Sequence, residues 1–110
     1  MVLDGPISDE LAELIARRFH LLAEPTRIKL LDRLRVGEAS VHELAAHVGT
    51  TQQNVSKHLR ALAEGGVVER RKQGNFAYYR VVDDGIFELC HIVCDSAERR
   101  LEELQAVLHA

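Results

Sequence analysis

The residues best suited to chemistry lie near the C-terminus, within a stretch whose apolar spacing predicts one long helix. Cys90 and Cys94 are four residues apart, so a helix places both thiols on one side. Two thiolates at this spacing can share a soft metal ion, and thiols of this kind can also sense oxidation. The opposing interpretation is that both are small buried hydrophobic residues. A disulfide between them has poor geometry inside a helix.

A polar ridge on the same helix offers a second set of ligands. His91, Asp95 and Glu98 follow one another at intervals of about one helical turn. Nitrogen and oxygen ligands suit nickel, zinc or cobalt, although a solvated helix flank has the same pattern. The candidate metal ligands are therefore Cys90, Cys94, His91 and Asp95, and the candidate cofactor is a divalent transition metal such as nickel or zinc.

Polar side chains over residues 52–64 indicate a different chemistry. If Val55, Leu59 and Leu62 face inward, the opposite side of the helix carries amide and basic groups. Amides pair with adenine edges, and lysine contacts guanine or phosphate. No carboxylate interrupts this side before Glu64. The pattern predicts contact with nucleic acid, with an ordinary solvated helix face as the alternative.

The charge of the chain is unevenly distributed, which supports the nucleic-acid interpretation. The net charge of −3 combines −2 over residues 1–49, +4 over residues 50–80 and −5 over residues 81–110. A local basic patch matters more for nucleic-acid binding than the total charge. The turn at residues 73–75 is surrounded by basic side chains that suit phosphate or minor-groove contacts, and that are expected on one side with Lys57 and Arg60, namely Arg70, Arg71, Lys72 and Arg80.

The elements that must position these residues can be predicted from apolar spacing and turn signals. Helices are expected over about 8–23, 25–36, 41–48, 52–64 and 86–108, and a β-hairpin over about 67–82. The second helix is expected to bury Ile28, Leu31 and Leu34. Ser40 with Glu43, and Thr50 with Gln53, fit capping boxes, and Thr51 is a second candidate cap for the helix at 52–64.

This order of elements predicts a mainly α fold with a small β-hairpin, the winged helix-turn-helix. The 110 residues form one domain, with the helix-turn-helix at about 40–65 and the wing at about 67–82. Ile86, Cys90, Val93, Ala97, Leu101, Leu104 and Leu108 form an apolar stripe on the last helix. So long a stripe predicts a homodimer built on the helices at about 8–23 and 86–108.

Several classes of protein are excluded by what the sequence lacks. No segment reaches the length of a membrane span, and no secretory signal is present, so we expect a cytoplasmic protein with reduced thiols. The chain has no glycine-rich phosphate loop, metalloprotease histidine pair or nucleophile elbow, and Cys90 and Cys94 are too far apart for a Cys-x-x-Cys motif. We therefore do not expect an enzyme.

Several ordered motifs resemble the ArsR/SmtB family of bacterial transcriptional regulators. The most specific are Ala-Glu-Pro-Thr-Arg at 23–27 and Val-Ser-Lys-His-Leu at 55–59, and the resemblance extends from about residue 17 to 104. It implies a homodimer that binds an inverted-repeat operator in double-stranded DNA, by family default as a repressor. The DNA-binding residues that it implies are Gln52, Gln53, Asn54, Ser56, Lys57, Arg60, Arg71 and Lys72.

The sequence departs from the family at both familiar metal sites. Residues 40–45 contain no cysteine, and Ile86, Ala97 and Arg100 replace expected ligands after Asp84. Three signals therefore stay open: a metal at an atypical site on the last helix, thiol oxidation at Cys90 and Cys94, or an accessory sensor protein. A winged-helix module that contacts only proteins is the alternative function.

Overall fold

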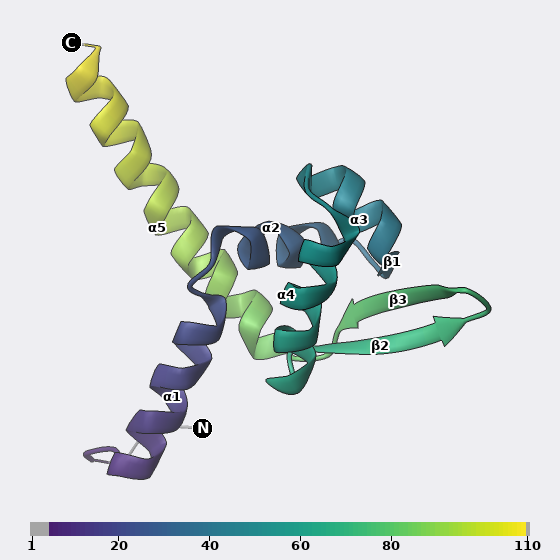
Figure 1. Ribbon diagram of the computed structural model, residues 1–110. Helices are drawn as coiled ribbons and strands as arrows, with labels where there is room; N and C mark the ends of the chain where they lie inside the picture. Colours follow the sequence, from purple (N-terminus) through teal and green to yellow (C-terminus); the bar gives the residue numbers. More distant parts are fainter. Residues whose placement is uncertain (1–4, 110) are drawn as a thin grey trace.

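The computed structural model describes residues 5–109, and Figure 1 shows the arrangement of its elements. The order confirms the predicted fold and adds one short strand, β1, that the sequence did not reveal. A two-residue strand is too short to show an alternating pattern. The elements are α1 (Asp9–Leu22), α2 (Pro25–Leu34), β1 (Ala39–Ser40), α3 (Val41–Val48), α4 (Gln52–Glu64), β2 (Val68–Gln73), β3 (Phe76–Val81) and α5 (Asp84–Leu108).

Side-chain caps fix where the two helices of the helix-turn-helix begin. The predicted capping box of α3 is present, because the Ser40 hydroxyl accepts from the Glu43 N–H and the Glu43 carboxylate accepts from the Ser40 N–H. The predicted box of Thr50 with Gln53 is wrong. Thr51 caps α4 by accepting from the Asn54 N–H, and Thr50 accepts from the Asn54 side-chain amide instead.

The three strands form an antiparallel sheet in the order β1-β3-β2. The hairpin register pairs Val68 with Val81 at its base and Gln73 with Phe76 at its tip. Gly74 turns the chain there with a φ of +60°, a conformation that glycine adopts without steric cost. The hairpin projects from one side of the helical body (Figure 1), so its tip is free to meet a partner.

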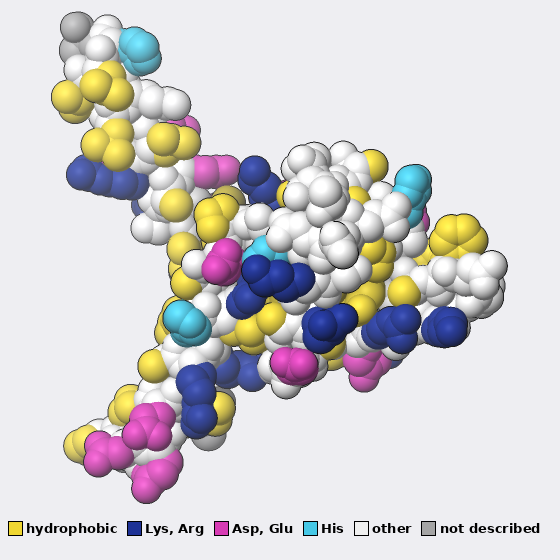
Figure 2. Space-filling model, in the orientation of Figure 1, with side chains coloured by type: hydrophobic (Ala, Val, Ile, Leu, Met, Phe, Trp, Pro, Cys, Tyr) yellow, Lys and Arg dark blue, Asp and Glu magenta, His cyan; other side chains and the backbone are white. Residues whose placement is uncertain are grey.

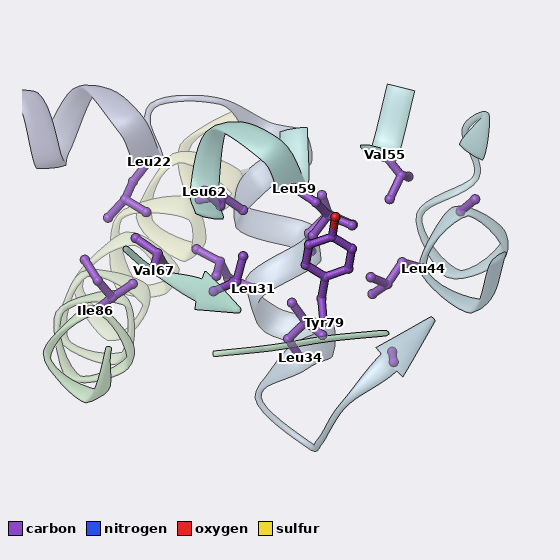
Figure 3. Close-up of a cluster of buried hydrophobic side chains, with 14 residues drawn as sticks. Leu22, Leu31, Leu34, Leu44, Val55, Leu59, Leu62, Val67, Tyr79 and Ile86 are labelled. Carbon is purple, nitrogen blue, oxygen red and sulfur yellow. The ribbon is translucent and has the colours of Figure 1, made fainter. Parts of the chain in front are cut away.

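The core lies where α2, α4 and the sheet meet (Figure 3). Leu59 and Tyr79 lie near the middle of the cluster, with Ile86 of α5 at one end and Val55 towards the other. The prediction that Ile28 is buried is wrong: its side chain is 52% exposed. The inward side of α2 instead carries Leu30, Leu31 and Leu34, all at 3% exposure or less.

The helices α1 and α5 extend away from this core on the side opposite the hairpin (Figure 1). Every residue from 91 to 109 is exposed. The apolar stripe of α5 is consequently uncovered beyond its first turns, with Val93, Leu101 and Leu104 each about half exposed. Hydrophobic atoms are visible on both projecting helices (Figure 2). Within residues 5–109, none of the helices has the length and apolar character needed to cross a membrane.

Candidate nucleic-acid interface

One side of α4 is buried and the other side presents polar groups. Val55, Leu59 and Leu62 are fully buried, which confirms the predicted inward positions. On the outer side, Gln53 and Lys57 are exposed, and neither side chain has a hydrogen bond or ion pair within the described residues. Both side chains therefore have their full hydrogen-bonding capacity available for a ligand.

The other α4 side chains that were predicted to contact bases already have hydrogen-bond partners or are partly buried. The Gln52 amide lies 3.1 Å from Nδ1 of His42 on α3, and the Asn54 amide donates to the Thr50 hydroxyl at 3.2 Å. Ser56 is half-buried. These side chains are oriented by the protein itself, and the His42 contact joins the two helices across the turn between them.

The hairpin divides its basic residues between two faces. Neighbouring residues of a strand point to opposite sides, and Arg70 pairs with Tyr79 while Lys72 pairs with Ala77. Tyr79, Ala77 and Arg70 line a groove of about 540 Å³ between the hairpin and α4, together with Ser56, Arg60 and Glu64 of the helix. Arg60 of α4 and Arg70 of β2 are thus exposed cations at one groove.

Arg71 lies on the other face of the hairpin and is already paired. Its guanidinium passes over the ring of Tyr78, 5.0 Å from the centroid, and donates to both carboxylate oxygens of Glu38 at 2.6 and 3.1 Å. The hydrogen bond from Arg71 holds the pKa of Glu38 below its usual value. Arg80, on the same face, pairs with Glu69 at 2.9 Å.

Within residues 5–109, the cations of α4 and the hairpin that lack a carboxylate partner therefore lie on α4 and on the groove side of the hairpin. These cations are Lys57, Arg60, Arg70 and Lys72. Figure 2 shows Lys and Arg side chains following one another from the body out along the hairpin. Cations arranged in this way suit contact with a phosphate backbone. The expectation that all the basic wing residues share one side is wrong: Arg71 and Arg80 lie on the opposite face, as the two-residue period of a strand requires.

The two thiols of α5 have surroundings that disfavour the thiolate. Cys90 is half-buried, and burial together with the neighbouring Cys94 raises its pKa. Cys94 is exposed, and its pKa is raised mainly by the carboxylate of Glu98, to which its thiol donates at 3.8 Å. A raised pKa makes a thiol a slower nucleophile at neutral pH.

The predicted metal ligands do not assemble into a site within this one chain. His91 Nε2 and Asp95 Oδ2 are 3.9 Å apart, and both side chains are largely exposed. No group of three histidine, cysteine or carboxylate side chains able to hold a metal occurs among the described residues. The familiar family positions do not fit a metal either, because Ser40 is committed to its capping box and Ile86 is buried in the core.

The arrangement of a short helix, a tight turn, a second helix with a polar outer side and a basic hairpin defines a winged helix-turn-helix DNA-binding domain. A helix-turn-helix domain family matches residues 22–71. The repressor SmtB of Mycobacterium tuberculosis is 33% identical over 99 residues, which cover 90% of this chain and 71% of SmtB. The chain belongs to the ArsR/SmtB family of transcriptional regulators.

Solved structures agree with this assignment. The antimony-specific transcriptional repressor AntR is 31% identical, with a TM-score of 0.83 and 90% of each chain covered. A homodimeric winged helix-turn-helix DNA-binding domain from Mycobacterium bovis is 32% identical, with a TM-score of 0.77 over 94% of this chain and 95% of that one. The matched relatives are regulators and not enzymes, as the sequence predicts.

The length of the relatives varies. The chain spans only 42% of the regulator Rv0324 of Mycobacterium tuberculosis, which is 33% identical over 94 residues and 86% of this chain.

Proposed function

We propose that this chain is a cytoplasmic, homodimeric repressor that binds an inverted-repeat operator in double-stranded DNA. The observation that carries the proposal is the shared face of α4 and the hairpin. There Gln53 and Lys57 are exposed on α4, and the groove beside the helix is lined by Arg60 and Arg70, with Glu64 at its end. Amide and ammonium groups suit base edges, and the guanidinium groups suit phosphates.

The shape of α4 fits the major groove. Thirteen residues at 1.5 Å each give a helix about 20 Å long, and a major groove admits a single α-helix. With the N-terminal half of α4 in the groove, the hairpin lies over the adjacent backbone, where Arg70 and Lys72 contact phosphates. Glu64, in the last turn of α4, lines the same groove as Arg60 and Arg70, so we assign the base contacts to the N-terminal half of the helix.

The dimer is supported by the uncovered apolar surface of α1 and α5. Phe19, Ile28, Val93 and Leu101 are each about half exposed and line one groove of about 460 Å³. A monomer rarely exposes a continuous apolar surface of this kind to water. A second copy would cover it and would place two α4 helices on one side of the assembly, as a two-fold symmetric operator requires. The homodimeric relative from Mycobacterium bovis supports the same assembly.

The proposal includes three candidate signals that would release the DNA. The first is a divalent or thiophilic metal ion held by the Cys90 and Cys94 thiols, with further ligands from a second copy because one chain does not assemble three. AntR is antimony-specific, which supports testing thiophilic ions. Oxidation of the same thiols is the second signal, and an accessory sensor protein is the third.

A selection experiment tests the DNA-binding proposal. The purified chain is mixed with a pool of duplexes of random sequence, the retained duplexes are sequenced, and the affinity for the enriched sequence is measured at several salt concentrations. We expect an inverted repeat, two chains per duplex and an affinity that falls steeply with salt, since bound phosphates release counterions. Enrichment of no sequence, with binding no tighter than to a random duplex, would contradict the proposal and favour a module for protein contacts.

Titration of the dimer on its operator with Ni(II), Zn(II), Sb(III) and a mild oxidant then distinguishes the signals. A signal that acts through the thiols must be lost in the Cys90→Ser/Cys94→Ser variant. If no ion and no oxidant changes the affinity, the accessory protein is the remaining route.

A further inference from the structure

His58 is a polar side chain in the middle of α4, and it faces inward. It is only 5% exposed and lies beside the fully buried Leu59. Its Nδ1 accepts a hydrogen bond from Nε of Arg27 on α2, at 3.1 Å. A buried ring nitrogen without a hydrogen-bond partner would destabilise the folded chain. Helix α2 must therefore present a donor to His58, and Arg27 supplies it.

Arg27 uses a second nitrogen to reach the end of α1. Its Nη1 donates to the main-chain carbonyl of Leu21 at 2.9 Å. One guanidinium therefore joins the last turn of α1 to the middle of α4. The planar guanidinium fixes the directions of both hydrogen bonds, because they come from two different nitrogens. A lysine has a single nitrogen and cannot reproduce this geometry at both acceptors.

The last turn of α1 also contacts the far end of α4. The side chain of Leu21 packs directly against Gly65, where a larger residue would collide with it. Arg18 donates to the Gly65 carbonyl at 3.4 Å and pairs with Asp83, the residue that caps α5. Helix α4 is thus held against α1 at two places, His58 and Gly65, which are about two helical turns apart.

We propose that Arg27 is a positioning residue that sets the orientation of α4 relative to α1, and through α1 the separation of the two α4 helices in the dimer. The inference rests on the proposed function, since α1 is half of the proposed dimer surface and α4 is the proposed DNA-contacting helix. In a two-fold dimer any tilt of α4 occurs in both copies, and both tilts contribute to the change in distance between the two α4 helices. The link therefore determines which half-site spacing the protein accepts.

The charge around His58 is consistent with an accepting, neutral ring. Burial, Arg27 and Lys57 lower the pKa of His58, and Glu24 opposes them. A neutral ring whose Nδ1 accepts from Arg27 carries its proton on Nε2. The link is therefore intact at neutral pH, where the protein would bind DNA.

Duplexes that differ only in half-site spacing test the proposal. Affinities are measured for the selected operator and for versions with one or two base pairs added or removed between its halves. The test variant is Arg27→Lys, which keeps the charge and loses the two-point contact. The matched control is Arg33→Lys on the same helix, where the arginine donates only to the Gly37 carbonyl and lies 3.9 Å from Glu43. The variant His58→Asn supplies an uncharged oxygen near the position of Nδ1.

We expect the wild-type chain and Arg33→Lys to prefer one spacing over its neighbours by about tenfold or more, the cost of one lost hydrogen bond to a charged group. Arg27→Lys should lose most of that preference while remaining dimeric, folded and able to bind a single half-site, and His58→Asn should retain part of it. A purely structural role predicts weaker binding to all spacings with the preference unchanged.

An Arg27→Lys variant that keeps the wild-type spacing preference overturns the proposal while leaving the proposed function intact. A wild-type chain that binds all spacings equally also overturns the proposal, and a wild-type chain that enriches no operator in the selection overturns both. The two failures are therefore distinguishable in one set of measurements.

Discussion

Arg71 and Glu38 form a two-point ion pair across the central strand of the sheet. Both oxygens of the Glu38 carboxylate accept from the Arg71 guanidinium, which also covers the ring of Tyr78. A phosphate that approaches this face of the hairpin must compete with a carboxylate already in place. Arg71 is therefore less available to a phosphate than the basic residues on the groove side of the hairpin, which have no ion pair in the described part of the chain.

Removing the carboxylate should release Arg71. We expect Glu38→Gln to raise DNA affinity by up to about fivefold, because an exposed ion pair of this kind is worth little more than that. Fluorescence anisotropy with a labelled operator at low salt measures the effect. Glu102→Gln, which removes a carboxylate of the same charge on α5, far from the hairpin, is the control for a general change in charge. An affinity that does not rise above that of the control would show that Arg71 has no part in binding.

The inner face of the hairpin should carry the salt dependence. We expect Arg70→Ala and Lys72→Ala each to reduce the slope of log affinity against log salt by about one, the value for one lost phosphate contact. Arg71→Ala should change the slope less, since its charge is already partnered. Equal losses for all three variants would place both faces of the hairpin against the DNA.

The capping box of α3, the hairpin and the inward side of α4 could be predicted because each depends on residues close together in the chain. Ser40 with Glu43 and the turn at Gly74 are local signals of this kind. The pair of Arg71 with Glu38 spans 33 residues and depends on the register of three strands, one of which is too short to predict. The exposure of Ile28 depends on which side of α2 meets α4, which apolar spacing alone did not settle.

The buried histidine should make stability depend on pH. The pKa of His58 is lowered from 6.5 in the folded chain, so the unfolded chain takes up a proton first as the pH falls. The free energy of unfolding should therefore decrease as the pH falls below about 6.5, until the folded ring is protonated too. Urea denaturation between pH 5 and 8 measures this. The variant His58→Asn should lose this part of the dependence, whereas His47→Asn, which changes an exposed histidine, should keep it. Identical pH profiles for wild type and His58→Asn would contradict the prediction.

The proposed dimer surface should fail when a charge is placed on its apolar stripe. Leu101→Glu puts a carboxylate in the groove formed with Phe19 and Val93, and burying it unpaired is costly. We expect sedimentation velocity to show a folded monomer with much weaker operator binding. Arg99→Glu changes the charge on the opposite side of α5 and should remain dimeric. A dimeric Leu101→Glu variant would place the interface elsewhere.

The thiols of α5 should react slowly at neutral pH. Their raised pKa values mean that Cys90 and Cys94 hold less thiolate at pH 7 than a free cysteine does. Alkylation by iodoacetamide, followed by mass spectrometry, should be slower than for glutathione at pH 7 and should accelerate as the pH rises towards 10. Glu98→Gln should speed the reaction of Cys94, because Glu98 is the largest cause of its shift. Rapid alkylation of either thiol at pH 7 would instead support the oxidation-sensing candidate.

The most direct test of the account concerns Gln53, the exposed amide at the N-terminal half of α4. Competition assays with operators that carry every single-base change compare the wild-type chain with Gln53→Ala, using Glu102→Gln on α5 as the control. The account predicts that Gln53→Ala loses discrimination at one position in each half-site, at a cost of about 1–3 kcal/mol, with other positions unchanged. Unchanged discrimination at every position would contradict the claim that α4 reads the bases.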